Sequence, residues 1–155
     1  LQWLEPHLSK HDLILGTDST MGESSDWIRT FLTSNLAITS TAVIRRTLFD
    51  EAGGFPEGYF GAPLPKRTPG FEDYELWLKC LVILTKSSRK DRFELIRNQH
   101  VVVEPQPEGA GRMKLRLQMM REAVTLMHIA PSLPSRYWPV LARRLAGAGK
   151  AIVVE

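Results

Sequence analysis

Hydrophobic residues recur at helical spacing in four stretches of the chain, where they mark one face of an α-helix. These stretches are residues 27–33, 72–84, 112–129 and 135–146. Four shorter apolar stretches have the length and residue types of buried strands. They are residues 12–16, 36–44, 92–97 and 101–103. With a further helix expected before the first strand, this mixture predicts an α/β fold in which a mixed sheet is flanked by helices.

The middle of the chain combines a strand, a short helix, a long loop and a helix that opens on two carboxylates. It reads TSTAVIRRTLFDEAGGF and, after the loop, EDYELWLK. Gly53 is predicted to form the left-handed cap of the short helix, and Gly54 to turn the chain so that Phe55 docks into the core. Glu72 and Asp73 lie in a first helical turn, where the helix dipole favours carboxylates even without a catalytic role.

In this order and spacing, the two motifs resemble the acceptor half of family-2 glycosyltransferases. The match covers residues 35–80, and weaker agreement at residues 1–16 extends it to about half of the chain. The resemblance implies a partial GT-A fold, the nucleotide-diphospho-sugar transferase fold, in residues 1–107, followed by a helical segment in residues 108–155. It implies transfer of a sugar from a nucleotide-sugar donor to a hydroxyl of a sugar, lipid-linked or polysaccharide acceptor.

The resemblance also implies roles for individual residues. A carboxylate must take the proton of the acceptor hydroxyl, and the family pattern places this base on Asp73. Glu72 would position the acceptor or raise the pKa of its neighbour. The substrate-binding candidates are Thr39, Ser40, Arg45, Arg46, Tyr59, Lys66, Arg67 and Trp77. Each also has an ordinary explanation as a strand hydroxyl, a helix-face charge, a loop residue or, for Trp77, a core residue.

A divalent metal, Mn²⁺ or Mg²⁺, is implied by the resemblance as well. In the family an Asp-x-Asp element holds it, and that element would lie just before Leu1, outside this sequence, together with the donor-binding half. No metal ligand is therefore expected in the chain from the resemblance. His7 and His11 could form half of a metal site, but no third ligand is adjacent in the sequence, and a helix C-terminus favours histidine without a metal.

The sequence also departs from the family pattern after the strand at residues 101–103. Members of the family often carry an Arg and a His there, which approach the donor phosphates or the metal. This chain has Glu104, Pro105, Gln106 and Pro107 instead. Among the basic candidates Arg45, Arg46, Lys66 and Arg67, the last two, which lie in the long loop, are the better ones for contacting phosphate.

The two C-terminal helices support an alternative function as a non-catalytic interaction or membrane-surface module. In the first of these helices, apolar residues recur in a stripe at intervals of four and three residues, which predicts a face that packs in the core or against a partner helix. This stripe is Met113, Leu117, Met120, Val124 and Met127. The second helix carries aromatic and aliphatic residues on one side and arginines on the other. This pattern is typical of a helix at a membrane surface, but packing against the first helix explains it equally well.

Composition narrows the functional classes and the cellular locations to be expected. The net charge of +3 is too small to indicate nucleic-acid binding, and 43% hydrophobic residues suffice for a core. A single cysteine, Cys80, excludes an internal disulfide and favours a reducing compartment. No signal peptide is visible in the given sequence, and it contains no run of about 18 apolar residues. We expect a cytoplasmic location, with possible peripheral contact at the inner face of the membrane, and the start at Leu1 suggests an excised piece.

Overall fold

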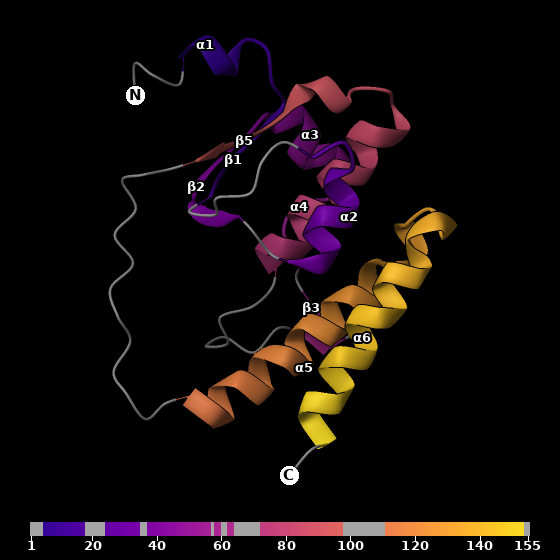
Figure 1. Cartoon of the computed structure of the whole chain (residues 1–155). Helices are drawn as coiled ribbons and strands as arrows, with labels where there is room; N and C mark the ends of the chain where they lie inside the picture. The colour runs from indigo at the N-terminus through magenta and orange to yellow at the C-terminus, as the bar shows by residue number, and fades with distance from the viewer. Residues whose placement is uncertain are drawn as a thin grey trace.

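The computed structural model describes residues 5–17, 24–34, 37–56, 58–59, 62–63, 72–97 and 111–153. Helices and strands alternate along the chain, as the sequence predicts for the α/β class (Figure 1). The strands are β1 (Leu13–Thr17), β2 (Ile38–Ile44), β3 (Gly58–Tyr59), β4 (Ala62–Pro63) and β5 (Phe93–Arg97). The α-helices are α1 (Glu5–Leu8), α2 (Trp27–Thr33), α3 (Arg46–Glu51), α4 (Glu72–Lys86), α5 (Gly111–Ile129) and α6 (Trp138–Val153). Short 3₁₀ turns are η1 (Lys90–Arg92), η2 (Ala130–Ser132) and η3 (Ser135–Tyr137).

Three strands form a mixed sheet in the order β2-β1-β5. The central strand β1 pairs antiparallel with β2 and parallel with β5. All five residues of β1 are buried. Gly16 is required at the point where β1 meets β2, because a Cβ atom there would lie 2.1 Å from the Oγ1 atom of Thr41.

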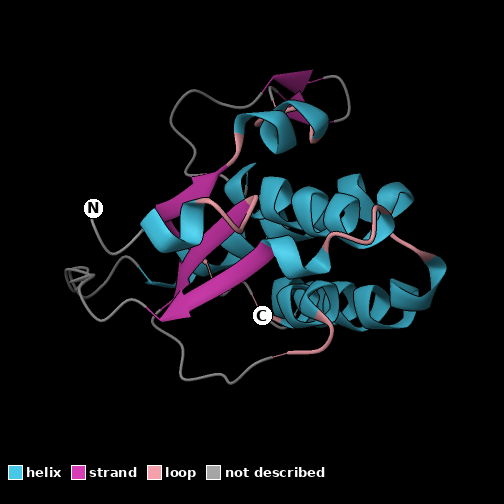
Figure 2. Ribbon diagram, turned by 90° about the horizontal axis from the view of Figure 1, so that it is seen from above, coloured by secondary structure: helices cyan, strands magenta, loops and turns pink. Residues whose placement is uncertain are grey.

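The two faces of the sheet differ. Leu13 and Leu15 of β1 and Phe93 of β5 belong to the hydrophobic core. Glu94 is in register with Ile14, so both point to the opposite face. On the core face, Phe93 makes edge-to-face contacts with two aromatic side chains of α2, Trp27 and Phe31. Figure 2 shows the three strands along one side of the helical layer.

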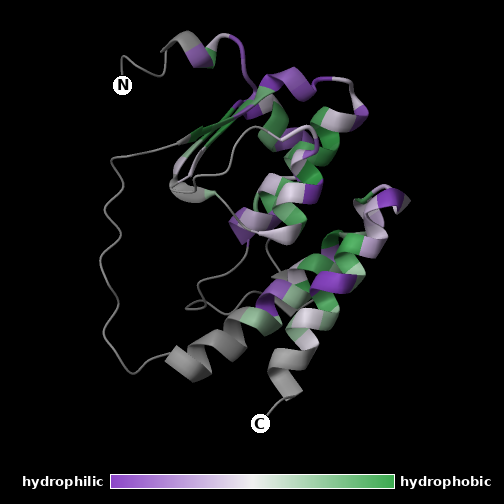
Figure 3. Ribbon diagram, viewed as in Figure 1, coloured by the Kyte–Doolittle hydropathy of each residue, from purple (hydrophilic) through white to green (hydrophobic). Residues whose placement is uncertain are grey.

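Helix α4 lies at the centre of the core, and hydrophobic residues follow its packed side (Figure 3). Its buried apolar residues are Tyr74, Leu76, Trp77, Leu78, Cys80, Leu81, Val82 and Leu84. Each fully buried side chain of this size contributes about 1.5–3 kcal/mol relative to exposure. The Tyr74 hydroxyl donates a hydrogen bond of 2.6 Å to the Phe31 carbonyl oxygen, which joins α4 to the end of α2. The predicted helix is confirmed, and its first turn is firmly anchored.

The C-terminal helices share this core. Helix α5 packs against α4 and α6, and α6 also packs against α2. Leu126, Ile129, Tyr137 and Leu141 belong to the same hydrophobic cluster as the sheet. The Tyr137 hydroxyl donates to the Asp26 carboxylate, which itself accepts from the Arg29 backbone N–H group and caps α2.

The core alternative for the predicted hydrophobic stripe of α5 is wrong at two of its positions. Met120 is 50% exposed and Met127 is 47% exposed, while the side chains of Met113 and Leu117 are not among those described. Among the described side chains of α5, the buried ones are Thr125, Leu126 and Ile129. The physical reason is that α5 packs against α4 and α6 at once, so the buried face is set by these two neighbours and not by a single heptad seam.

Two further local predictions need correction. Phe55 does not dock into the core: its side chain is 46% exposed and packs edge-to-face on Phe49. Helix α6 does not end near residue 146 but continues through Gly147 and Gly149, even though glycine costs about 1 kcal/mol within a helix. The buried Ala148 lies between these glycines, so the tertiary contacts of α6 outweigh the local preference.

The glycine cap of α3 is as predicted. Gly53 and Gly54 have φ angles of 79° and 68°. The Gly54 N–H group donates to the Phe49 carbonyl oxygen, and the Gly53 N–H group donates to the Asp50 carbonyl oxygen. These two bonds define a Schellman motif. In the predicted loop 56–70, β3 and β4 form a short hairpin; the predicted strand at residues 101–103 lies outside the described residues.

Candidate functional site

The two predicted catalytic carboxylates open α4. Glu72 and Asp73 occupy its first turn and are half-buried. Asp73 accepts a 2.7 Å hydrogen bond from the Tyr74 backbone N–H group through its Oδ1 atom. The Oε2 atom of Glu72 is buried and has no hydrogen-bond partner within the described part of the chain. Because an unmade hydrogen bond of a buried polar group costs about 1–3 kcal/mol, this oxygen is ready to receive a donor.

A third carboxylate follows one turn later, and sequence reasoning missed it. Glu75 is fully buried, and its Oε1 atom lies 2.6 Å from the Lys79 Nζ atom and 3.0 Å from the His128 Nδ1 atom. The i, i+3 spacing of Glu72 and Glu75 places both on one side of α4. Glu75 and Lys79 are four residues apart, and this i, i+4 spacing was a local signal for their ion pair. Nothing in the sequence indicated that His128 of α5 also contacts Glu75.

The other predicted substrate-binding residues are dispersed. Thr39 and Ser40 lie on β2 and Tyr59 lies on β3, but their side chains are not among those described. Lys66 and Arg67 lie outside the described residues.

Trp77 lies within the core. Its side chain is 2% exposed, and it belongs to the same cluster as the sheet residues. An aromatic ring needs an accessible face to stack on a sugar, and this ring is covered. The structure therefore matches the core interpretation of Trp77 and leaves it no open surface as a sugar platform.

The two adjacent arginines both make ion pairs. Arg45 donates from Nε to the Asp12 carboxylate at 2.6 Å and from a terminal nitrogen to the Leu8 carbonyl oxygen at 3.1 Å. Arg46 is 83% exposed and donates to both carboxylate oxygens of Asp50 one turn along α3, at 2.9 Å each. Arg45 therefore ties α3 to β1, while Arg46 forms a helix-face pair on the surface.

Asp12 is the centre of a network that we call the arginine clasp, formed by Asp12, Arg45, Arg89 and Arg92. Asp12 is 5% exposed, and its Oδ1 atom lies 2.8 Å from Arg92 while Oδ2 lies 3.6 Å from Arg89. Burial by itself would raise the pKa of Asp12, but hydrogen bonds from Arg92 and Arg45 outweigh this effect and lower the pKa. The clasp joins segments that are far apart in the sequence, so local patterns gave no sign of it.

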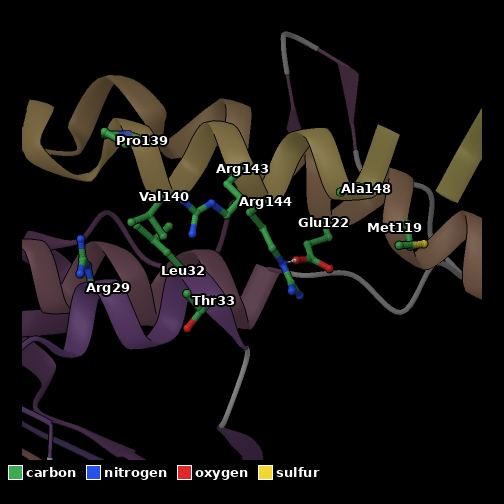
Figure 4. Close-up of a pocket in the computed structure, with 11 residues that line it drawn as sticks. Arg29, Leu32, Thr33, Met119, Glu122, Pro139, Val140, Arg143, Arg144 and Ala148 are labelled. Atoms are coloured by element: carbon green, nitrogen blue, oxygen red, sulfur yellow. Dashed lines mark hydrogen bonds and ion pairs between the residues drawn. The ribbon is translucent and has the colours of Figure 1, made fainter. Parts of the chain in front are cut away.

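A cavity of about 620 Å³ lies between α2, α5 and α6 (Figure 4). Its charged lining consists of Arg29, Arg143, Arg144 and Glu122, and Leu32, Met119 and Val140 contribute apolar surface. Arg144 pairs with Glu122, so three positive charges face one negative charge.

The same ion pair acts on the start of α4. Burial, and secondly the negative charge of Glu122, raise the pKa of Tyr74 above its ordinary range, while Arg144 opposes the rise. Tyr74 directly follows Asp73 in the sequence. Glu122 and Arg144, which line the cavity, therefore act in opposite directions on Tyr74.

A second cluster lies on the far face of the sheet. His7 of α1, His11 in the turn after it and Glu94 of β5 place one ligand atom each within 4.8 Å of one another. Glu94 supplies the third ligand that the sequence around His7 and His11 lacks. Two imidazoles and one carboxylate suit Mn²⁺ and Mg²⁺ less well than an ion that favours nitrogen, because both prefer oxygen ligands. Within the part of the chain that is described, this is the one group of three or more such side chains close enough together to hold an ion.

Comparison of the chain with protein-family models, with curated proteins and with solved structures finds no match. The relation to family-2 glycosyltransferases therefore stays a hypothesis that depends on the two sequence motifs. Of the helices that are described, none is at once long enough and apolar enough to pass through a lipid bilayer.

Proposed function

We propose that the chain is the acceptor-side part of a GT-A-type glycosyltransferase, in which Asp73 takes the proton of the acceptor hydroxyl. The observation that carries the proposal is the opening of α4: two half-buried carboxylates, one of them with a buried oxygen that has no partner within the described residues. The mixed sheet with flanking helices is compatible with this fold class. The donor would be a nucleotide-sugar, and the acceptor a sugar, a lipid-linked sugar or a polysaccharide.

The reaction assigns different tasks to the two carboxylates. As the acceptor oxygen attacks the anomeric carbon, its proton moves to the Asp73 carboxylate and the bond between the anomeric carbon and the diphosphate oxygen breaks. The electron pair of that bond leaves with the nucleoside diphosphate. Glu72 lies beside Asp73 in the same turn and positions the acceptor.

The rest of α4 supports this role by holding its first turn still. A base contributes most when its position is fixed before the substrate arrives. The bond from the Tyr74 hydroxyl to the Phe31 carbonyl oxygen anchors the residue next to Asp73. The leaving diphosphate needs positive charge. A divalent metal held outside this sequence would supply that charge when bound, and Lys66 and Arg67 are the candidates within the chain.

The direct test is Asp73→Asn in the full-length protein. We expect sugar transfer to fall by at least about a hundredfold, because general base catalysis contributes that much or more, while the nucleotide-sugar still binds. Sugar transfer and donor binding are measured side by side, with thermal unfolding to verify the fold. Asp50→Asn is the matched control, since it removes an exposed carboxylate of α3. Turnover that survives the Asp73 substitution would contradict the assignment of the base.

A second candidate function has its own observation. Trp138 is 57% exposed at the start of α6, and the cationic cavity lies along the same helix. An exposed tryptophan beside arginines is typical of helices that lie on anionic membrane surfaces. The C-terminal helices would then act as a membrane-surface module, with or without the enzyme activity.

Flotation with lipid vesicles tests this second candidate. We expect co-flotation with anionic vesicles and not with zwitterionic ones, reduced by added salt, because charge attraction carries most of the binding. Arg143→Gln should weaken the co-flotation. Arg46→Gln, a similarly exposed arginine on α3, should leave it unchanged. Equal flotation with both vesicle types, or with neither, would rule out this electrostatic membrane module.

A further inference from the structure

The three side chains of the His7, His11 and Glu94 cluster converge from two separate elements. The Oε2 atom of Glu94 lies 2.6 Å from the His7 Nδ1 atom and 3.2 Å from the His11 Nδ1 atom. The two imidazole rings are 6.2 Å apart between centroids, with an angle of 28° between their planes. One carboxylate oxygen therefore faces both rings, and the rings present their nitrogens to the same small volume.

The backbone holds the two histidines in this position. The His11 N–H group donates to the His7 carbonyl oxygen at 3.0 Å, which continues the hydrogen-bond spacing of a helix past the end of α1. This spacing places both imidazoles on one side of the turn. The His11 Nδ1 atom also lies 3.0 Å from the His7 carbonyl oxygen. This contact orients the His11 ring, and a metal bound through Nδ1 would replace it.

The arginine clasp fixes Glu94 relative to the histidines. Asp12 directly follows His11, and Arg92 lies two residues before Glu94. The Asp12 backbone N–H group donates to the Arg92 carbonyl oxygen at 2.7 Å, and the two side chains form an ion pair. Arg45 donates to the Leu8 carbonyl oxygen in the same turn. These contacts hold the segments that carry His11 and Glu94 next to each other.

We propose that His7, His11 and Glu94 bind a divalent transition metal that prefers imidazole, with Zn²⁺ as the expected ion. Two histidines and one carboxylate are a known ligand set for zinc, and water completes the four-coordinate shell. The side chains are 34%, 16% and 30% exposed, so the ion and its water have access from solvent. Binding replaces the contacts between Glu94 and the imidazoles with bonds to the metal and releases any proton that they share.

This site differs from the metal implied by the family resemblance in ligands and in location. Its ligands are nitrogen-rich, whereas Mn²⁺ and Mg²⁺ prefer oxygen. It lies on the sheet face opposite the core, whereas the proposed catalytic carboxylates lie on α4. The inference is therefore independent of the proposed glycosyltransferase function, and each can fail without the other.

The test is calorimetric titration of the chelator-treated protein with Zn²⁺. We expect one ion per chain, and a dissociation constant at least about tenfold weaker in His7→Gln, His11→Gln and Glu94→Gln. His128→Gln is the matched control, because it removes an imidazole next to a different carboxylate, Glu75. The control should bind Zn²⁺ like the unchanged chain, and Mg²⁺ should give no binding at this site.

A spectroscopic measurement separates a real site from adventitious binding. Co²⁺ in place of Zn²⁺ should give the absorption of a four-coordinate ion in the unchanged chain and in His128→Gln, but not in the three ligand variants. Thermal unfolding without metal verifies that each variant is folded. Absence of Zn²⁺ binding, or equal binding in the ligand variants and the unchanged chain, would show that the cluster is only a hydrogen-bonded histidine and carboxylate group.

Discussion

Asp12 and Glu72 are both carboxylates with buried oxygen atoms, yet their surroundings are opposite. Asp12 is surrounded by the three arginines of the clasp, and its pKa is lowered because their hydrogen bonds outweigh the effect of burial. Glu72 keeps one buried oxygen for which the described residues offer no partner. The difference teaches that burial alone does not mark a functional carboxylate. The partners of a buried carboxylate have to be compared as well, because Glu75 and Arg92 also keep a buried polar atom without a partner among the described residues.

The largest effect on stability is expected at Asp12, the carboxylate whose oxygens are paired with arginines. Asp12→Asn should lower the free energy of unfolding by about 2 kcal/mol, because Arg45 and Arg92 then face a neutral group in a partly buried place. Urea unfolding followed by circular dichroism measures the change. Asp50→Asn, which removes an exposed ion pair with Arg46, should cost less than about 0.5 kcal/mol. Similar losses in the two variants would contradict the contrast between them.

The titration of Asp12 should also contribute to the pH dependence of the free energy of unfolding. The pKa of Asp12 is lower in the folded chain than its ordinary value of 3.8. The folded state therefore binds the proton less readily than the unfolded state, and the stabilisation is complete above the unfolded pKa. It is lost as the pH falls through the lowered, folded-state pKa. In unfolding curves between about pH 7 and pH 2, the free energy of unfolding of the unchanged chain should approach that of Asp12→Asn as the pH falls. A difference in stability that persists at low pH would contradict the role of the clasp.

The smallest effect on stability is expected at the unsatisfied carboxylate. Glu72→Gln should change the free energy of unfolding by less than about 1 kcal/mol in either direction, since no partner within the described residues is lost at Oε2. In the full-length protein, the same variant should raise KM for the acceptor more than it lowers kcat. A large loss of stability with unchanged acceptor KM would make Glu72 a structural residue.

Local signals in the sequence sufficed for several elements. The glycine pair predicted the end of α3. The carboxylates followed by periodic apolar residues predicted α4 and its buried side. These features depend on interactions within a few residues, which a single sequence contains.

The features that the sequence did not reveal depend on contacts between distant segments. Glu94 meets His7 across 87 positions, and Arg92 meets Asp12 across 80. Glu75 and His128 are joined only because α5 packs on α4. Met120 and Met127 of the α5 stripe are exposed for the same reason, since two neighbouring helices decide which side of α5 is covered. One sequence without its tertiary contacts cannot specify such pairs.

The parallel pairing of β1 with β5 has a consequence for how the chain acquires its fold. The two strands are neighbours in space, but α2, β2, α3 and α4 lie between them in sequence. Closing so long a loop is entropically costly and slows folding. During synthesis, the edge of β1 that pairs with β5 stays unpaired until β5 has been made, and an unpaired strand edge is prone to pair with other chains. The last strand of the sheet to emerge from the ribosome thus protects the first from aggregation.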